Sequence, residues 1–217
     1  MKNANRRDIL QVIFRRLYQA FGQQHWWPAK TPFEVMVGAV LTQNTAWGNV
    51  EKAIDNLRSA KCLSPRKLES ISSGRLARLI RPSGYYNIKA KRLKSLVNFI
   101  FEKYDGKLSR MGKAGLTQLR CQLLEVNGIG PETADSILLY ALDKPVFVVD
   151  AYTKRIFSRH GILEKEAEYA KAQDIFMQGL KPRVKLFNEY HALLVRLGKD
   201  YCRKKPLCNL CPLQGLK

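Results

Sequence analysis

Apolar residues recur along this chain at the spacing of one face of an α-helix. Residues 10–21 and 93–104 place large apolar side chains three and four positions apart. Similar stripes cover residues 33–44, 50–57, 116–126, 137–142 and 186–197, with short glycine, proline and serine connections between them. Residues 146–149 form the only run typical of a β-strand. The pattern predicts an all-α fold of about ten short helices without a long linker.

The charge of the chain indicates what kind of partner it binds. Of 217 residues, 38 are lysine or arginine and 18 are aspartate or glutamate, so the formal charge is +20. This excess predicts a polyanionic partner. The most apolar run, residues 33–41, is far shorter than the ~18 residues of a membrane helix, and the N-terminal segment lacks the apolar core of a secretory signal. We therefore expect a cytoplasmic protein that does not bind membranes, and we also expect it to act as a monomer.

Residues 123–135 predict a helix, a Gly-Ile-Gly turn and a second helix. Gly128 and Gly130 allow positive φ on either side of Ile129. Peptide N–H groups at the start of the second helix can then approach a phosphate, which the helix dipole also favours. The segment predicts a contact with a nucleic-acid backbone that does not read sequence. A purely structural helix–helix turn is the alternative.

An apolar run leads from this hairpin to Asp150, at a predicted helix start. Asp150 can serve as an N-cap, worth about 1 kcal/mol. The order of hairpin, aspartate and a later cysteine cluster resembles the endonuclease III superfamily of helix-hairpin-helix DNA glycosylases, from about residue 33 to residue 211. In that family the matching aspartate is catalytic and lies beside the flipped-out nucleotide. The resemblance implies that Asp150 is both cap and catalyst.

The same resemblance implies two helical lobes with a DNA-binding cleft between them. One lobe is a six-helix barrel over residues 25–143 that carries the hairpin, and the other combines residues 1–24 and 144–217. Because Glu132 and Asp150 come from different lobes, the active site is expected in the cleft.

The residue at position 132 bears on the reaction. In relatives that also cleave abasic sites, a lysine at this place forms a Schiff base with the sugar. This chain has Glu132, and a carboxylate cannot act as an amine nucleophile. The sequence therefore predicts a monofunctional DNA glycosylase, in which Asp150 supports hydrolysis by water.

Residues 25–28, 38–47 and 81–93 resemble the bacterial 3-methyladenine glycosylases of the superfamily, which also carry the hairpin glutamate. The resemblance implies a base pocket formed by Trp26, Trp27, Pro28 and Trp47, with Glu132 close by as a second catalytic residue beside Asp150. An N3-alkylated purine is a cation, so electron-rich rings attract it by roughly 0.5–2 kcal/mol per contact. Ordinary core packing is the alternative for each tryptophan.

Polar and basic residues predict the rest of the DNA contact. Gln43 and Asn44 resemble the polar wedge that fills the gap left by a flipped base, and a polar helix surface is the alternative. Lys89, Lys91 and Arg92 belong to a basic stretch that we expect to bind phosphates, although a solvated helix face has the same composition.

Three of the five cysteines crowd the C-terminal region, which favours metal ligation over disulfides. Cys202-x5-Cys208-x2-Cys211 resembles the iron–sulfur loop of endonuclease III, and this implies a 4Fe-4S cluster with a structural and DNA-docking role. The expected fourth cysteine falls at position 217, where the chain has Lys217. An altered chain end, an unusual fourth ligand and a relic loop remain open, and zinc is the competing metal.

The three histidines have no metal-ligand spacing, and His191 is expected to be a core residue or to support a neighbouring site residue.

Taken together, the residues predict a base excision repair enzyme that hydrolyses the N-glycosidic bond of an alkylated purine in damaged double-stranded DNA. Two other enzymes remain open: a bifunctional glycosylase and lyase for oxidised pyrimidines that uses a lysine elsewhere, and a mismatch-specific glycosylase. A DNA-binding module without catalytic activity also remains open as a hypothesis that is not an enzyme.

Overall fold

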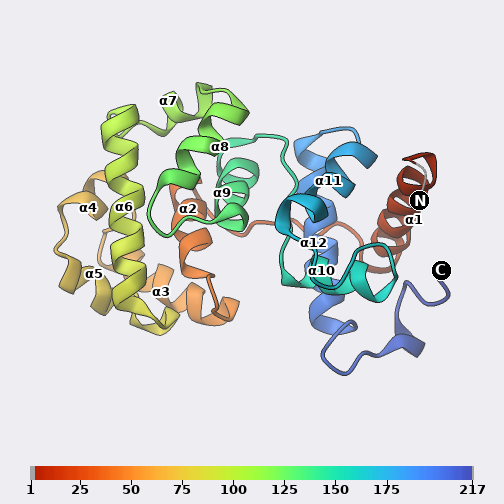
Figure 1. The fold of residues 1–217 in the computed structure, drawn as a ribbon. Coiled ribbons are helices and arrows are strands. Elements are labelled where there is room, and N and C mark those ends of the chain that lie inside the picture. Colours follow the sequence, from red (N-terminus) through yellow and green to blue (C-terminus); the bar gives the residue numbers. More distant parts are fainter. Residues whose placement is uncertain (1–2, 217) are drawn as a thin grey trace. The chain divides into compact units, whose positions relative to one another are not determined.

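A computed structural model describes residues 3–216, and within this range the chain is helical with no β-strand (Figure 1). The predicted all-α fold is confirmed. The range contains twelve α-helices, of which α1, α6 and α12 have 17 to 19 residues, so the helices are more numerous and less uniformly short than the sequence predicts. No helix in the described residues is long and apolar enough to cross a membrane.

The chain divides into two compact units, one of residues 29–144 and one of residues 1–28 with 145–217. The first contains eight α-helices, where the resemblance implies a barrel of six, and three of the eight have only six residues. They are α2 (Pro32–Leu41), α3 (Trp47–Ser59), α4 (Pro65–Ser70), α5 (Ser73–Leu79), α6 (Tyr86–Tyr104), α7 (Leu108–Lys113), α8 (Leu116–Glu125) and α9 (Pro131–Ser136), with the 3₁₀ helix η1 (Arg81–Ser83) and the short π-helix η2 (Ile137–Ala141).

Helix α2 is the centre of this unit. All its residues from Phe33 to Leu41 are buried, because it packs against α3, α6, α9 and η2. A helix that is apolar on every side is stable only when it is surrounded in this way. The Thr31 side chain caps its start by accepting the Glu34 N–H, and Pro32 suits the first turn, where its missing N–H is not needed. Helix α2 therefore fixes where the turn after Leu41 begins.

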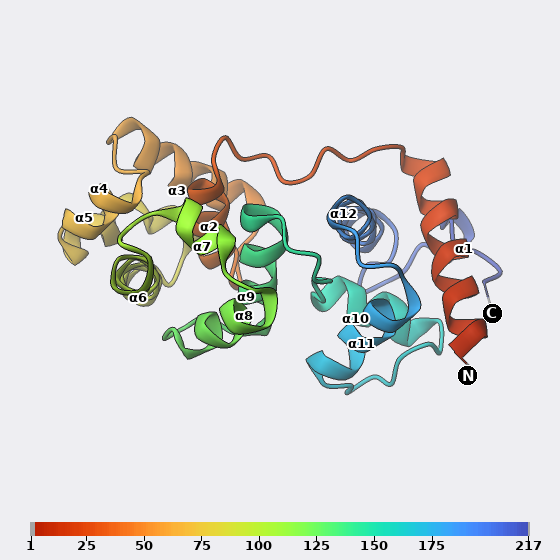
Figure 2. The same cartoon turned by 90° about the horizontal axis from the view of Figure 1, so that it is seen from above.

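The second unit consists of α1 (Asn3–Phe21), α10 (Ala151–Arg159), α11 (Tyr169–Gly179), α12 (Val184–Asp200) and the short η3 (Cys208–Leu210). Helix α12 packs against α1 and α10, and α1 also packs against α11, as the view along the α12 axis in Figure 2 helps to show. The core is rich in aromatic rings, and Phe147 stacks on Phe176 with ring centroids 3.7 Å apart. This core fixes the segment that leads to Asp150.

Residues 146–149 are buried, belong to no helix, and pair with no strand in residues 3–216. The β-strand that the apolar run indicates is not formed, and two side chains of α11 instead bond the backbone of this segment. The Val149 N–H donates to the Tyr169 hydroxyl (3.3 Å), and Gln173 Nε2 donates to the Phe147 carbonyl (2.7 Å). These bonds satisfy backbone groups that would otherwise be buried without a partner.

Candidate functional site

The predicted hairpin is present, and Gly128 is the position that requires glycine. Its φ is +83°, and a Cβ there would lie 2.2 Å from Arg92 Cγ. Gly130 has an ordinary extended conformation with open space around its α-carbon, so the expectation of positive φ is wrong there. Ile129 is 4% exposed, and its N–H donates to the Val126 carbonyl inside the turn (3.0 Å). Ile129 thus anchors the turn.

Gln43 joins the turn after α2 to this hairpin. Its Nε2 donates to the Gly128 carbonyl (3.0 Å) and to Thr133 Oγ1 (2.9 Å). Its Oε1 accepts a hydrogen bond from the Arg92 guanidinium. Asn44, the next residue, is exposed with φ +53°. The structure therefore brings Gln43, Arg92 and Gly128 together, while Asn44 is exposed in the turn after α2.

Lys89 does not face solvent, so its predicted phosphate contact is wrong. It is 1% exposed, and its ammonium donates to the carbonyls of Leu41 and Ser83 (2.7 Å each) and to Thr45 Oγ1 (2.6 Å). Burial, helped by the nearby Arg92 charge, lowers the pKa of Lys89 to about 8. The ammonium holds the turn that carries Gln43. Lys91 is exposed and Arg92 is half-buried, and their contact with phosphates stays a prediction.

An ion pair that sequence analysis did not identify joins the two hairpin helices. Asp135 of α9 is fully buried, and Arg120 of α8 binds it through Nε to Oδ1 (2.7 Å) and Nη2 to Oδ2 (3.1 Å). A single acid inside the apolar stretch after position 132 was the available signal, because a buried carboxylate needs a cationic partner. The pair fixes the direction in which α9 leaves the turn.

The predicted base-pocket residues are divided between the two units. Glu132 is exposed in the first turn of α9, and Trp47 is half-buried at the first position of α3. Trp26 and Trp27 belong to the other unit, where their rings meet edge to face with centroids 5.6 Å apart. Pro28, which follows them, is exposed. The rings of Trp26 and Trp27 therefore contact each other, and a base pocket that they share with Trp47 and Glu132 stays a prediction.

Asp150 caps α10, as its sequence position predicts. Its Oδ1 accepts the Thr153 N–H (2.7 Å), and its Oδ2 lies 3.7 Å from His191 Nε2. Burial alone would raise the pKa of Asp150, but the His191 imidazole and the Thr153 N–H outweigh burial and bring the pKa below its usual value. The carboxylate is therefore ionised at neutral pH although its side chain is only 12% exposed.

His191 completes this arrangement from α12. It is 5% exposed, and the Phe147 ring lies edge to face against it with centroids 6.5 Å apart. The expectation of a buried histidine that supports a site residue fits this position. Its partner Asp150 could not be named from the sequence, because the two residues meet only through packing of α12 on α10.

The three C-terminal cysteines are unpaired thiols around one cavity of about 310 Å³. Burial, together with the neighbouring Cys202 and Cys208, raises the pKa of the Cys211 thiol. Arg159 Nη1 donates a hydrogen bond to Cys202 Sγ (3.2 Å). Three thiols directed at one cavity are a donor set suited to an iron–sulfur cluster. Cys202, Cys208 and Cys211 are the residues that would hold it.

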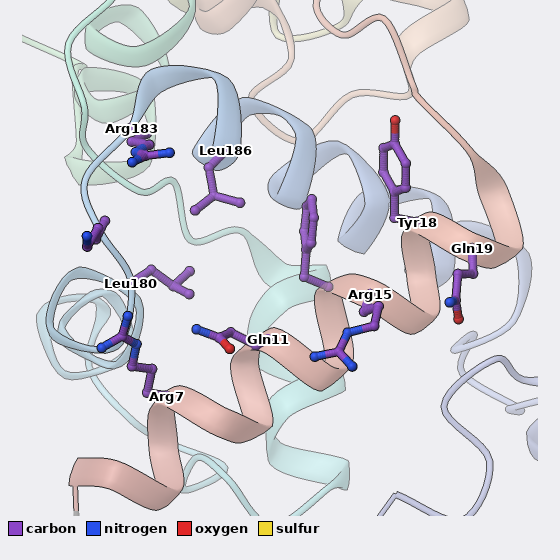
Figure 3. A pocket seen from close by; sticks show the side chains of 10 residues that line it. Arg7, Gln11, Arg15, Tyr18, Gln19, Leu180, Arg183 and Leu186 are labelled. Carbon is purple, nitrogen blue, oxygen red and sulfur yellow. The ribbon is translucent and has the colours of Figure 1, made fainter.

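A second cavity, of about 680 Å³, lies in the same unit and is lined by α1 and by residues around the start of α12 (Figure 3). Apolar side chains of Phe14, Tyr18, Leu180 and Leu186 share its wall with four cationic ones, Arg7, Arg15, Lys181 and Arg183. None of these lining residues is a predicted site residue. The cavity is separate from the residues discussed above.

Comparison with known proteins supplies the family. Residues 37–182 match the HhH-GPD superfamily of base excision DNA repair proteins. The chain belongs to this superfamily. It is 49% identical over 212 residues to a Methanocaldococcus jannaschii protein assigned to the DNA repair glycosylases, covering 97% of this chain and 96% of the relative. The protein is thus a DNA glycosylase of base excision repair.

Two solved structures of the superfamily are similar in fold. One is H. pylori 3-methyladenine DNA glycosylase bound to 1,N6-ethenoadenine, at 31% identity and a TM-score of 0.76, covering 89% of this chain and 97% of that one. The other is a trapped endonuclease III–DNA covalent intermediate, at 21% identity and a TM-score of 0.83, covering 97% and 94%. In the present chain, the region that matches the superfamily includes Trp47, Glu132 and Asp150, whereas Trp26, Trp27 and the three C-terminal cysteines fall outside it.

Proposed function

We propose that this DNA glycosylase is monofunctional and removes alkylated purines of the 3-methyladenine type from damaged double-stranded DNA. The observation that carries the proposal is the glutamate in the first turn of α9, where lyase-competent relatives have lysine. Glu132 supplies no amine, so the covalent Schiff-base route has no nucleophile at this place. The similarity to a 3-methyladenine glycosylase over most of both chains supports the substrate class.

The lysine with the lowered pKa of about 8 is not a substitute nucleophile. Catalytic lysines need a depressed pKa and access to the sugar. Lys89 meets the first condition but is 1% exposed, with its ammonium bonded to three oxygen atoms of its own unit. This arrangement favours the monofunctional proposal over the alternative that uses a lysine elsewhere.

Asp150 is the proposed catalytic group. When the bond between base and sugar breaks, the electron pair leaves with the base and positive charge develops on the sugar. A carboxylate that is ionised and held by two fixed partners, His191 and the Thr153 N–H, stabilises that charge without having to reorganise. Water then adds to the sugar carbon, and Asp150 accepts its proton.

Removal of the proposed substrate requires little catalysis beyond stabilisation of the charge on the sugar. A cationic N3-alkylpurine is already a good leaving group, so the enzyme must mainly extrude the nucleotide and bind the base. We assign base binding to Trp26, Trp27, Pro28, Trp47 and Glu132, and DNA-backbone binding to Gly128, Gly130, Lys91 and Arg92. Asn44, with Gln43, is the proposed wedge. The three cysteines are proposed to hold a 4Fe-4S cluster, and the enzyme is proposed to act as a monomer in the cytoplasm.

The test measures base release and strand nicking side by side on duplexes that carry 3-methyladenine, a thymine mismatch, an oxidised pyrimidine or an abasic site. We expect release of 3-methyladenine without nicking. Trp47→Ala is expected to reduce this release by about 10- to 100-fold, or roughly 1.4–2.8 kcal/mol at the transition state. Glu132→Gln should weaken excision of charged bases more than of neutral ones.

Borohydride trapping on abasic DNA tests whether the protein forms the covalent intermediate of a lyase. Covalent trapping and robust nicking by the unaltered protein would replace the proposal with the bifunctional alternative. Release confined to mismatched or oxidised bases would overturn the substrate class, and release of no base at all would favour a DNA-binding module without chemistry.

A further inference from the structure

The cavity between the three cysteines is better suited to a cluster than to a single ion. Zinc draws its four ligands to within about 4 Å of one another, since Zn–S bonds are about 2.3 Å long. In the described part of the chain, no group of three or more His, Cys, Asp and Glu side chains is placed to hold one metal ion. Cys202, Cys208 and Cys211 instead stand around a volume of about 310 Å³. A cavity of this size has room for a polynuclear group, whose ligands lie farther apart than those of a single ion.

Three thiols leave one iron of a 4Fe-4S cluster without a protein ligand, because four is the usual number. The resemblance places the fourth cysteine at position 217, where the chain has lysine. Residue 217 lies outside the described range. Leu216, the residue before it, lies within the described range and lines the cavity. A replacement ligand is therefore to be sought beside Leu216.

His160 lies at this place. It follows the last residue of α10, lines the same cavity as the three thiols, and its Nδ1 is 3.3 Å from the Leu216 carbonyl oxygen. Because a carbonyl can only accept a hydrogen bond, this contact favours a proton on Nδ1 and a lone pair on Nε2. Metal-binding histidines commonly use this arrangement, with one ring N–H on a backbone carbonyl and the other nitrogen on the metal.

We propose that His160 is the fourth ligand of a 4Fe-4S cluster whose other ligands are Cys202, Cys208 and Cys211. The proposal rests on the cofactor named under the proposed function and is independent of the base-excision chemistry. His160 Nε2 would donate its lone pair to the fourth iron, and the Arg159 guanidinium donates a hydrogen bond to Cys202 Sγ. A neutral imidazole in place of a thiolate makes the cluster less negative, so its reduction potential should exceed that of an all-cysteine cluster.

The direct test uses the complete, unaltered protein. It is purified without oxygen from cells grown with either ordinary or ¹⁵N-labelled histidine, reduced with dithionite, and examined by pulsed electron paramagnetic resonance. A nitrogen coupled to the cluster spin, whose signal changes with the label, is the expected result. This readout needs no substitution and therefore does not depend on a variant that folds.

Variants then assign the nitrogen. His160→Cys should keep about four irons per chain and lose the nitrogen coupling, because a thiolate replaces the imidazole. His160→Ala should lose the unligated iron in air, so that the iron content falls from about four to about three per chain. Asn209→Ala is the matched control, since Asn209 lines the same cavity but is not a proposed ligand. It should keep both the iron content and the coupling.

Each other result contradicts the proposal in a separate way. A cluster without histidine coupling, or four irons retained in His160→Ala, overturns the assignment of His160 and leaves the cluster in place. Bound zinc, or protein without metal, overturns the cluster as well. Base release from methylated DNA, measured on the same preparations, tells these failures apart from a failure of the glycosylase proposal.

Discussion

Asp150 has two tasks that a single substitution can separate. As the cap of α10 its Oδ1 accepts the Thr153 N–H, and as the proposed catalyst it supplies a negative charge. Asparagine caps helices about as well as aspartate, so Asp150→Asn should retain the fold. We expect excision to fall by more than about 100-fold, in line with the loss of one electrostatic group in other active sites, while DNA affinity stays equal or rises.

Asp174→Asn is the matched control for that experiment, since it removes the same charge from an exposed position on α11 in the same unit. It should excise at the normal rate. Base release by Asp150→Asn within about threefold of the unaltered protein would show that Asp150 is a cap and nothing more.

Lys89 predicts an unusual pH dependence of stability. Its pKa in the folded protein is about 8, against an ordinary value of 10.5. Between these values the unfolded chain binds the proton and the folded chain does not, so stability rises with pH. The gain should reach about 2 kcal/mol by pH 10. It is measured as the difference in unfolding free energy between the unaltered protein and Lys89→Met from pH 7 to pH 10.

The control is Lys91→Met, which removes an exposed lysine from the same helix. Its stability difference from the unaltered protein should be flat over this pH range. A flat difference for Lys89→Met as well would mean that burial does not shift the pKa of Lys89.

At the scale of elements, the two glycines of the hairpin differ in backbone conformation and in the space around them. Gly128 has φ +83° and contacts the Arg92 side chain, whereas Gly130 is extended and open. A Cβ in a left-handed conformation costs roughly 1–2 kcal/mol, and Arg92 must also move away from Gln43. Gly128→Ala should therefore lower the unfolding free energy by about 1–3 kcal/mol and weaken DNA binding, as measured by urea denaturation and titration of a labelled duplex.

Gly130→Ala serves as the comparison in the same turn. Its unfolding free energy should change by less than about 0.5 kcal/mol. Equal losses in the two variants would contradict the account of why glycine is required at position 128.

These elements also show what the sequence could predict. The helices and the Asp150 cap follow from apolar spacing and a local signal, and both depend on neighbouring residues. The Gln43 bonds to the hairpin and the Asp150–His191 contact join segments far apart in the chain, so no local pattern indicates them. The sequence does not reveal the burial of Lys89, because a lysine in a basic run is typical of a surface, and its burial depends on three oxygen acceptors supplied by packing.

At the scale of the whole molecule, the charge of +20 predicts how binding responds to salt. If about six phosphates are neutralised, the logarithm of the affinity for duplex DNA should fall with the logarithm of salt concentration at a slope near −5. The measurement is an affinity titration between about 50 and 200 mM salt. A flat response would mean that the positive charge is not directed at DNA.

Single lysines refine this prediction. Lys91→Gln should reduce the slope by about 1, because Lys91 is exposed next to Arg92 on α6. Lys171→Gln should leave it unchanged, since Lys171 is already paired with Glu164 (2.8 Å). A larger effect from Lys171 than from Lys91 would place the phosphate contacts elsewhere.

The buried, non-helical segment before Asp150 has a consequence for local opening. Tyr169 and Gln173 stand one turn apart on α11, and they bond the Val149 N–H and the Phe147 carbonyl in place of a strand. A strand ladder opens cooperatively, whereas a bond to one phenol can break when a single side chain rotates. Hydrogen–deuterium exchange at the Val149 amide should therefore proceed through local fluctuation and be much faster than exchange in α12. Tyr169→Phe should accelerate it further at this one amide, next to the proposed catalytic carboxylate.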